Sequence, residues 1–178
     1  MADEASVTPL TIRQATPTEA VRVAELAAQT FRETFAADND PADMADYLAT
    51  RFSPTQIATE LADPAATFLL AAVGSTVVGY AKLQASAVPD PVSGDAPLEL
   101  VRLYLRQAWT GRGYGRALMQ ACLDRARAEG YQTLWLGVWE HNHRARAFYQ
   151  RWGFTAVGAH DFWLGRDRQT DLILQRAL

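Results

Sequence analysis

The sequence contains very little of several features that mark specialised classes of protein. Its 178 residues include one cysteine, which cannot form an internal disulfide. No apolar run approaches the length of about 18 residues that a membrane span needs, and none follows a basic N-terminus. The net charge of −3 gives no basic face for nucleic acid. We therefore expect a cytoplasmic protein with neither a membrane nor a nucleic-acid partner.

The composition that is present suits one compact domain. Hydrophobic residues make up 49% of the chain and charged residues 21%, which is enough apolar material for a sizeable core. Residues 1–7 are predicted to form a loose polar tail, and residues 8–178 a single domain.

Capping residues, turn residues and apolar periodicity together predict a mixed α/β arrangement. The predicted strands cover residues 10–13, 67–73, 76–84, 98–105 and 133–138, with a closing pair that turns at 165–167. The predicted helices cover about 17–35, 41–50, 54–62 and 142–152, and one more runs from a glycine-rich segment to Gly130.

The glycine-rich segment, Thr110-Gly-Arg-Gly-Tyr-Gly-Arg-Ala-Leu-Met119, lies between a predicted strand and a predicted helix. Glycines in such a turn let backbone N–H groups converge on an anion where the helix dipole also favours negative charge. A dinucleotide fingerprint would need a third glycine where Leu118 stands. A nucleotide P-loop would need a lysine there, and the single lysine is Lys82. The segment therefore predicts a site for another phosphate-bearing cofactor.

A second segment indicates which phosphate-bearing cofactor the glycine-rich segment binds. Residues 139–154 contain Asn-x-x-Ala-x-x-Phe-Tyr-x-x-x-Gly-Phe, with Asn142 first and Phe154 last. With the glycine-rich segment, this pattern resembles the GNAT superfamily of N-acetyltransferases over about residues 8 to 176. Thr110 departs from that pattern, because the superfamily usually has Gln or Arg at this position. Arg112 and Arg116 are candidates to supply the missing charge.

The resemblance implies an α/β GNAT fold: a mixed, mostly antiparallel sheet of about seven strands, with splayed fourth and fifth strands and flanking helices. It also implies acetyl-CoA as cofactor, with its pantetheine arm in the gap between the strands 98–105 and 133–138. The implied cofactor-binding residues are Leu103, Tyr104, Leu105, Thr110, Gly111, Arg112, Gly113, Tyr114, Gly115, Arg116, Asn142, Ala145 and Tyr149.

Transfer of an acetyl group to an amine poses two proton problems. An alkyl amine has a pKa of about 10.4, so a base or a water must remove a proton before attack. Glu99, eleven residues before Thr110, matches the base of the histone-acetylating branch by spacing. Its alternatives are a carboxylate paired with Arg102 or Arg106, or replacement by a water relay. Tyr149 is the candidate acid for the departing thiolate, and simple core packing is its alternative.

Two further segments suggest the acceptor. Residues 162–171, which contain Leu-Gly-x-Asp-x-Gln-Thr-Asp, and residues 31–39 resemble a bacterial branch that acetylates spermidine and spermine. Acidic residues near the first helices would attract such a polycation, and those predicted to bind substrate are Glu33, Asp38 and Asp46. Asp40 and Asp43 are explained by helix capping. Basic protein N-termini, lysines and aminoglycosides stay open as acceptors.

Three further features of the sequence bear on metal binding, on catalysis and on dimerisation. His141, His143 and His160 offer too few partners for a zinc site, so no metal is expected. A non-catalytic acyl-CoA sensor would be expected to lose the tyrosine and the loop glycines, which this chain keeps. The aromatic residues Trp152, Phe154, Phe162 and Trp163 leave open either core packing or a homodimer interface.

Overall fold

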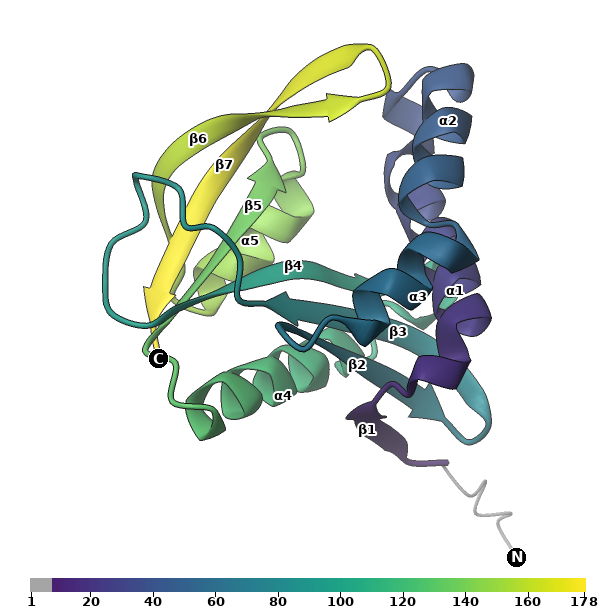
Figure 1. Cartoon of the computed structure of the whole chain (residues 1–178), viewed down its shortest axis with the longest axis horizontal. Helices are drawn as coiled ribbons and strands as arrows, with labels where there is room; N and C mark the ends of the chain where they lie inside the picture. The colour runs from purple at the N-terminus through teal and green to yellow at the C-terminus, as the bar shows by residue number, and fades with distance from the viewer. Residues whose placement is uncertain (1–7) are drawn as a thin grey trace, which may run out of the picture.

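The computed structural model describes residues 8–178, which form one seven-stranded sheet with helices on both faces (Figure 1). The strand order is β1-β2-β3-β4-β5-β7-β6. The strands are β1 (Leu10–Gln14), β2 (Ala66–Val73), β3 (Thr76–Gln84), β4 (Pro97–Leu105), β5 (Thr133–Trp139), β6 (Thr155–Leu164) and β7 (Asp167–Ala177). The helices are α1 (Ala20–Phe35), α2 (Pro41–Arg51), α3 (Pro54–Ala62), α4 (Tyr114–Ala128) and α5 (His143–Arg151). The predicted tail, residues 1–7, lies outside the described residues.

The α/β class and the order of elements predicted from the sequence are confirmed. Every neighbouring pair in the sheet is antiparallel except β4 and β5, which are parallel. Ser53 and Asp40 cap α3 and α2 through their side chains, as the Pro-containing start patterns predict. Among residues 8–178, no helix is long and apolar enough to cross a membrane.

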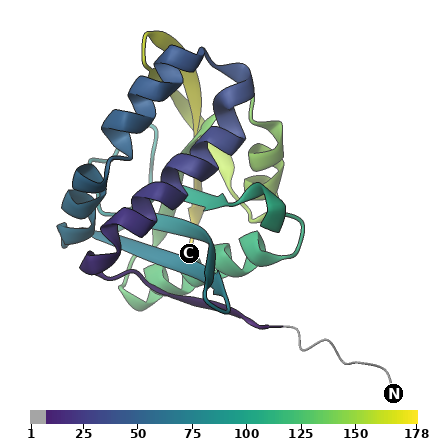
Figure 2. The same ribbon diagram turned by 90° about the vertical axis from the view of Figure 1, so that its right-hand side faces the viewer.

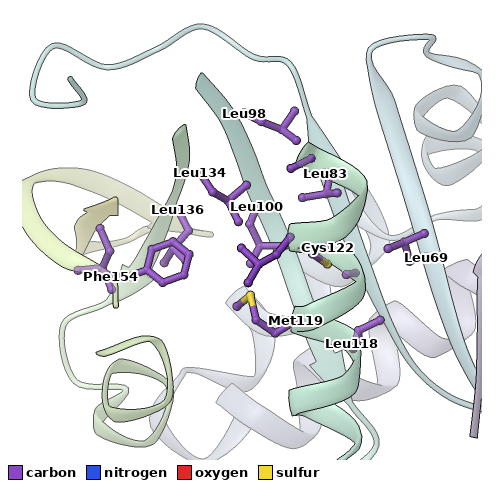
Figure 3. Close-up of a cluster of buried hydrophobic side chains, with 14 of the residues drawn as sticks. Leu69, Leu83, Leu98, Leu100, Leu118, Met119, Cys122, Leu134, Leu136 and Phe154 are labelled. Atoms are coloured by element: carbon purple, nitrogen blue, oxygen red, sulfur yellow. The ribbon is translucent and has the colours of Figure 1, made fainter. Parts of the chain in front are cut away.

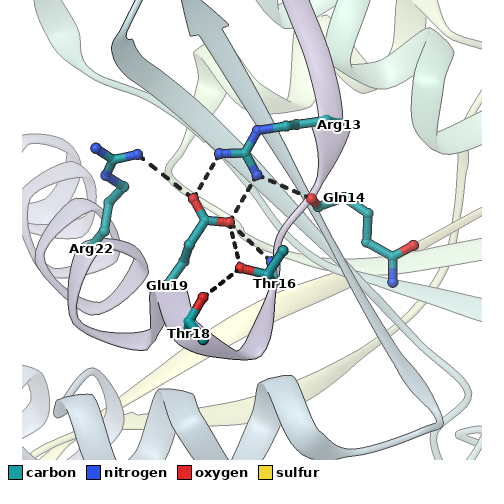
Figure 4. A network of polar contacts seen from close by, with 6 residues as sticks. All are labelled: Arg13, Gln14, Thr16, Thr18, Glu19 and Arg22. Carbon is teal, nitrogen blue, oxygen red and sulfur yellow. Dashed lines mark hydrogen bonds and ion pairs between the residues drawn. The ribbon is translucent and has the colours of Figure 1, made fainter.

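The junction between β1 and α1 is fixed by one carboxylate (Figure 4). Glu19 accepts two hydrogen bonds from Arg13, at 2.7 and 2.8 Å, and one from the Thr16 backbone N–H at 3.0 Å. The last of these is half of a capping box. The hydrogen bonds from Arg13 lower the pKa of Glu19 to about 2, so this carboxylate is ionised at neutral pH.

Each face of the sheet has its own hydrophobic core. Helices α1, α2 and α3 cover one face, with α4 and α5 on the other (Figures 1 and 2). Figure 3 shows the second core, where Leu118, Met119 and Cys122 of α4 pack against Leu100 of β4 and Leu136 of β5. The apolar residues at helical spacing on α4 therefore pack against the alternate apolar residues of β4 and β5. This packing fixes the position of the N-terminus of α4 relative to β4.

The sheet opens at its centre. β4 and β5 pair over three residues only, Pro97–Glu99 with Thr133–Trp135. Beyond Glu99, β4 continues along β3, and beyond Trp135, β5 continues along β7. The predicted splay of the fourth and fifth strands is thereby confirmed, and the gap lies between the two cores.

Candidate active site

Two residues of β4 present their backbone to the gap. The Arg106 N–H donates to the Val78 carbonyl at 2.8 Å, which continues the β3–β4 ladder. Alternate residues of an antiparallel pair point toward the same neighbour. The N–H and C=O groups of Leu103 and Leu105 therefore point away from β3, where β5 has already diverged. An extended ligand can pair with such an edge as an added strand would.

Tyr104, grouped with these two leucines by the resemblance, lies differently. Its backbone belongs to the half of β4 that pairs with β3. Its ring lies in the core under α1, 6.1 Å from the ring of Tyr80 and 6.4 Å from that of Phe31. The alternation of β4 places neighbouring residues on opposite edges and faces, so we do not assign Tyr104 to the cofactor edge.

The segment from Thr110 to Gly115 forms an open backbone cradle. Gly111 and Gly113 have φ angles of 78° and 82°, and a Cβ built on either would meet nothing within 4 Å. Glycine is needed there for the left-handed backbone, and the space beside it is free for a ligand. The Thr110 hydroxyl donates to the Gln107 carbonyl at 2.9 Å. The residue that departs from the superfamily pattern therefore keeps its side chain out of the cradle.

The N-terminus of α4 completes this cradle. The first hydrogen bond within the helix runs from the Ala117 N–H to the Gly113 carbonyl at 3.1 Å, so the three preceding N–H groups are not used by the helix. The first turn has no acidic residue, and Arg112 and Arg116 are exposed beside it. Free donors, the helix dipole and two guanidinium groups together suit a pyrophosphate.

Asn142 is the N-cap of α5, on the far side of the gap. Its Oδ1 accepts a hydrogen bond from the Ala145 N–H at 3.1 Å. Its Nδ2 group makes no hydrogen bond within residues 8–178, so capping leaves one polar atom available. The two roles considered for Asn142, cap and ligand contact, are compatible in this geometry.

Tyr149 lies on α5 in the core below the gap. Its ring is 5.4 Å from that of Phe148 and 5.7 Å from that of Phe154. Burial raises the pKa of Tyr149, and Cys122 of α4 adds to the effect. No group within residues 8–178 hydrogen-bonds its hydroxyl. Tyr149 therefore both packs in the core and carries a proton with no protein partner.

On the opposite face, Glu99 lies at the point where β4 and β5 separate. Its carboxylate accepts a short hydrogen bond from the Ser86 hydroxyl. Burial raises the pKa of Glu99, while Ser86 and the positive charge of Lys82 act in the other direction. Lys82 itself is bound to Glu60 at 2.9 Å.

Glu60 anchors α3 to this part of the sheet. It accepts hydrogen bonds from Lys82 and from both terminal nitrogens of Arg102, at 2.7 and 3.1 Å. Arg102 is thus paired with Glu60. The alternative in which Arg102 pairs with Glu99 is not the observed arrangement, and no ion pair joins Glu99 to a basic side chain within residues 8–178.

Two more titratable side chains lie over Gly137 of β5. A Cβ built on Gly137 would be 3.0 Å from His160 Nε2 of β6 and 3.4 Å from Asp171 Oδ2 of β7. Burial raises the pKa of Asp171 to about 6, with His160 acting in the opposite direction. His160 also acts on Glu99, so side chains from β4, β6 and β7 influence one another across the glycine.

Comparison with known proteins agrees with this geometry. Residues 21–154 match the model of the "Acetyltransferase (GNAT) family". An uncharacterised N-acetyltransferase of Lactobacillus delbrueckii subsp. lactis is 39% identical over 150 residues, covering 84% of this chain and 87% of the relative. The N-alpha-acetyltransferase RimI of Mycobacterium tuberculosis is 32% identical, covering 86% of this chain and 84% of the relative. The crystal structure of the PaiA N-acetyltransferase of Thermoplasma acidophilum with coenzyme A has the same fold, with a TM-score of 0.78, 21% identity and coverage of 96% and 99%.

The chain belongs to the GNAT family.

It is therefore an N-acetyltransferase that uses acetyl-CoA. The open glycine cradle, the unpaired edge of β4 and the free amide of Asn142 are the features that fit this cosubstrate.

On the face of the sheet covered by α1, α2 and α3, the β6–β7 hairpin of this GNAT domain reaches across to α2 (Figure 1). Gln169 Nε2 donates to Asn39 Oδ1 at 2.6 Å, and Arg166 Nε donates to Asp43 Oδ1 at 3.1 Å. Gly165, with φ of 59°, lies so close to Asp43 that a Cβ would be 2.6 Å from it. The contact between Gln169 and Asn39 joins the two segments, residues 162–171 and 31–39, that resemble the polyamine-acetylating branch.

The acidic residues predicted to bind substrate are more exposed than Glu99 and Asp171. The Glu33 carboxylate accepts hydrogen bonds from the Gln107 N–H at 2.7 Å and from Gln29 at 2.8 Å, so it ties α1 to the segment before the cradle. Asp38 and Asp46 are exposed. Asp40 caps α2, as expected, whereas the Asp43 side chain pairs with Arg166 instead of capping.

Sequence reasoning missed Asp171 and Gly137 and considered His160 only as a metal ligand. Asp171 ends the motif Leu-Gly-x-Asp-x-Gln-Thr-Asp, which was the available indication. Within residues 8–178, no group of three His, Cys, Asp or Glu side chains is arranged to hold a metal ion. Of the aromatic residues weighed for a homodimer, Phe154 is core and Trp163 is 57% exposed, and the homodimer stays a prediction.

Proposed function

We propose that this GNAT domain acetylates a primary amine of a polyamine such as spermidine or spermine. The observation that supports this best is the pair of half-buried carboxylates, Glu99 and Asp171, beside the gap. Both lie on the face of the sheet covered by α1 to α3, which we call the acceptor face. A polycation carries a positive charge for each of them, whereas a single amine leaves one unmatched. The exposed Asp38 and Asp46 would add to the attraction at the surface.

In this proposal Glu99 removes the proton from the reacting amine, directly or through a water. Its raised pKa makes it a better proton acceptor near neutral pH than an ordinary carboxylate. The hydrogen bond from Ser86 holds the carboxylate in place. Removal of the proton exposes the lone pair that attacks.

Tyr149 acts at the other end of the reaction. Acetyl-CoA supplies the activated acetyl group when it is bound. The Tyr149 hydroxyl stays protonated at neutral pH because burial raises its pKa, and it has no competing partner within the described residues. It can therefore give its proton to the departing sulfur.

A second acceptor class is favoured by one comparison. The relative from Mycobacterium tuberculosis is named an N-alpha-acetyltransferase and is 32% identical. A peptide N-terminus would enter the same face and use the same base and acid. The two classes differ in whether a second positive charge on the acceptor matters.

The deciding experiment measures thiol release from acetyl-CoA by the purified protein with one acceptor at a time. The panel contains spermine, spermidine, a peptide with a free N-terminus, a lysine peptide, an aminoglycoside and a buffer blank. We expect rapid release with the two polyamines. Release with the peptide alone would move the acceptor to the second class, and acetyl-CoA binding without release on any acceptor would favour a non-catalytic sensor.

A further inference from the structure

We propose that Asp171 and His160 form a subsite over Gly137 that binds a second, non-reacting ammonium group of the acceptor, while Glu99 serves the reacting nitrogen. This inference rests on the proposed function, because it concerns the same acceptor face. It adds residues that fix which amines are chosen: diamines and longer polyamines over amines with one positive charge.

The strand register places all three side chains on one face. Glu99 is opposite Trp135 on β5, Asp171 is opposite Trp139, and His160 is opposite Asp171. Directly opposed residues in a sheet share a face, and residues two or four apart along one strand do as well. Gly137 lies between the two tryptophans on that face, and because it has no side chain, the polar ends of His160 and Asp171 can approach its backbone.

Asp171 and His160 converge on one small volume. Both Asp171 Oδ2 and His160 Nε2 lie within 3.4 Å of the position that a Cβ of Gly137 would take. No hydrogen bond joins these two side chains within the described residues, so each has acceptor capacity left. An ammonium group has three donors and can donate to both the carboxylate and the imidazole when His160 is neutral.

The subsite is far enough from Glu99 to bind a different ammonium group from the one that Glu99 serves. Gly137, over which Asp171 and His160 converge, is two residues from Trp135 on β5, which corresponds to about 7 Å along the strand at about 3.3 Å per residue. Asp171 also comes from β7, on the opposite side of β5 from Glu99 of β4, which adds to the separation. A single amine cannot contact both ends of such a span, but two ammonium groups joined by a methylene chain can. Trp139 is half-buried alongside, and an indole face favours both methylenes and cations.

The charged groups around Asp171 leave its carboxylate able to bind the second ammonium group. His160 faces it from β6, and burial raises the pKa of Tyr47 on α2, an effect to which the charge of Asp171 adds. Lys82 and Arg102, the cations that act on Glu99, are bound to Glu60. Because the pKa of Asp171 is raised to about 6, the carboxylate is mostly protonated below pH 6 and mostly ionised above it. Binding of a second ammonium should therefore strengthen as the pH rises from 5 to 7.

The first test compares two acceptors of equal length, 1,4-diaminobutane and butylamine, by kcat/KM. We expect the wild type to prefer the diamine by about tenfold or more, the size of one charge-assisted hydrogen bond. Asp171→Asn should reduce this preference to near unity. Gly137→Ala should do the same, since its Cβ would lie 3.0 Å from His160 Nε2.

The matched control is Asp161→Asn. Asp161 is the next residue on β6, is exposed, and pairs with Arg168 at 3.0 Å, so the same charge is removed without touching the subsite. This variant should keep the wild-type preference. A wild type that does not distinguish the two amines, or an unchanged preference in Asp171→Asn, would overturn the subsite.

A binding measurement separates this inference from the proposed function. In protein saturated with coenzyme A, 1,4-diaminobutane should shift the imidazole NMR signals of His160, while exposed His141 and His143 serve as internal references. Asp171→Asn should abolish the shift. A shift without thiol release would support the subsite and contradict the polyamine transferase. Acetylation of the diamine with His160 unmoved would do the reverse.

Discussion

The two regions that we propose to bind the cofactor and the acceptor, called here the cofactor half and the acceptor half, are built in different ways. The cofactor half consists of the β4 edge, the cradle from Thr110 to Gly115 and the first turn of α4, which follow one another along the chain. The acceptor half brings together Glu99 of β4, His160 of β6 and Asp171 of β7 over Gly137 of β5. The first half works through backbone groups and the second through side chains. The cofactor half should therefore tolerate most side-chain changes and fail when its backbone changes, whereas the acceptor half should respond to single side chains.

The largest effect is expected from Tyr149→Phe on α5, because Tyr149 is the one side chain next to the backbone-built cofactor half that we propose to act as the general acid. We expect kcat to fall by about 100-fold or more, because general acid catalysis contributes at least this much. Affinity for coenzyme A, measured by calorimetry, should change little. Tyr131→Phe, just beyond the C-terminal end of α4, is the control, and equal kcat values in the two variants would remove Tyr149 from the acid role.

The next largest effect is expected on stability, from the ion cluster of Glu60, Lys82 and Arg102 next to the acceptor half. Glu60→Gln leaves Lys82 and Arg102 without a counter-charge in a largely buried site, and removing one partner of a buried pair costs about 3 kcal/mol or more. Denaturant unfolding should show this loss. Glu129→Gln, which breaks an exposed pair with Arg125, should cost less than about 1 kcal/mol. Similar losses in both variants would mean that the acceptor half does not depend on this cluster.

Backbone conformation in the cradle is tested by Gly113→Ala against Gly130→Ala. The two glycines have φ angles of 82° and 84°, and a Cβ meets nothing within 4 Å at either. Each substitution should cost about 1–2 kcal/mol of left-handed strain. Only Gly113→Ala should raise the KM for acetyl-CoA, by about tenfold. A rise in both, or in neither, would contradict a cradle made by the backbone.

The smallest effect is expected outside both halves, at the β1–α1 junction. Glu19→Ala removes a capping interaction and should lower the free energy of unfolding by about 1 kcal/mol at neutral pH. Folding lowers the pKa of Glu19 from 4.5 to about 2, so its contribution is present above pH 4.5 and is lost as the pH falls toward 2. The difference between wild type and variant should shrink over that range, with steady-state activity unchanged at neutral pH.

Much of the fold was predictable because its signals are local. Asp40-Pro41 and Ser53-Pro54 mark two helix starts, and Gly74-Ser75 marks a hairpin turn, each through the conformation of a few consecutive residues. The orientation of Tyr104 could not be predicted from neighbouring residues alone. Which edge a strand residue presents depends on hydrogen-bond register with β3, and a bulge at Val101 shifts that register.

The sequence by itself determined the cofactor cradle and the family, because glycines with left-handed backbone, a helix start and an asparagine cap act within a few residues of one another. Only the tertiary structure decided the acceptor half. It set β7 between β5 and β6, brought Asp171 and His160 over Gly137, and committed Arg102 to Glu60 rather than to Glu99. Strand order and register are long-range properties, and no spacing along the chain records which side chains they bring together.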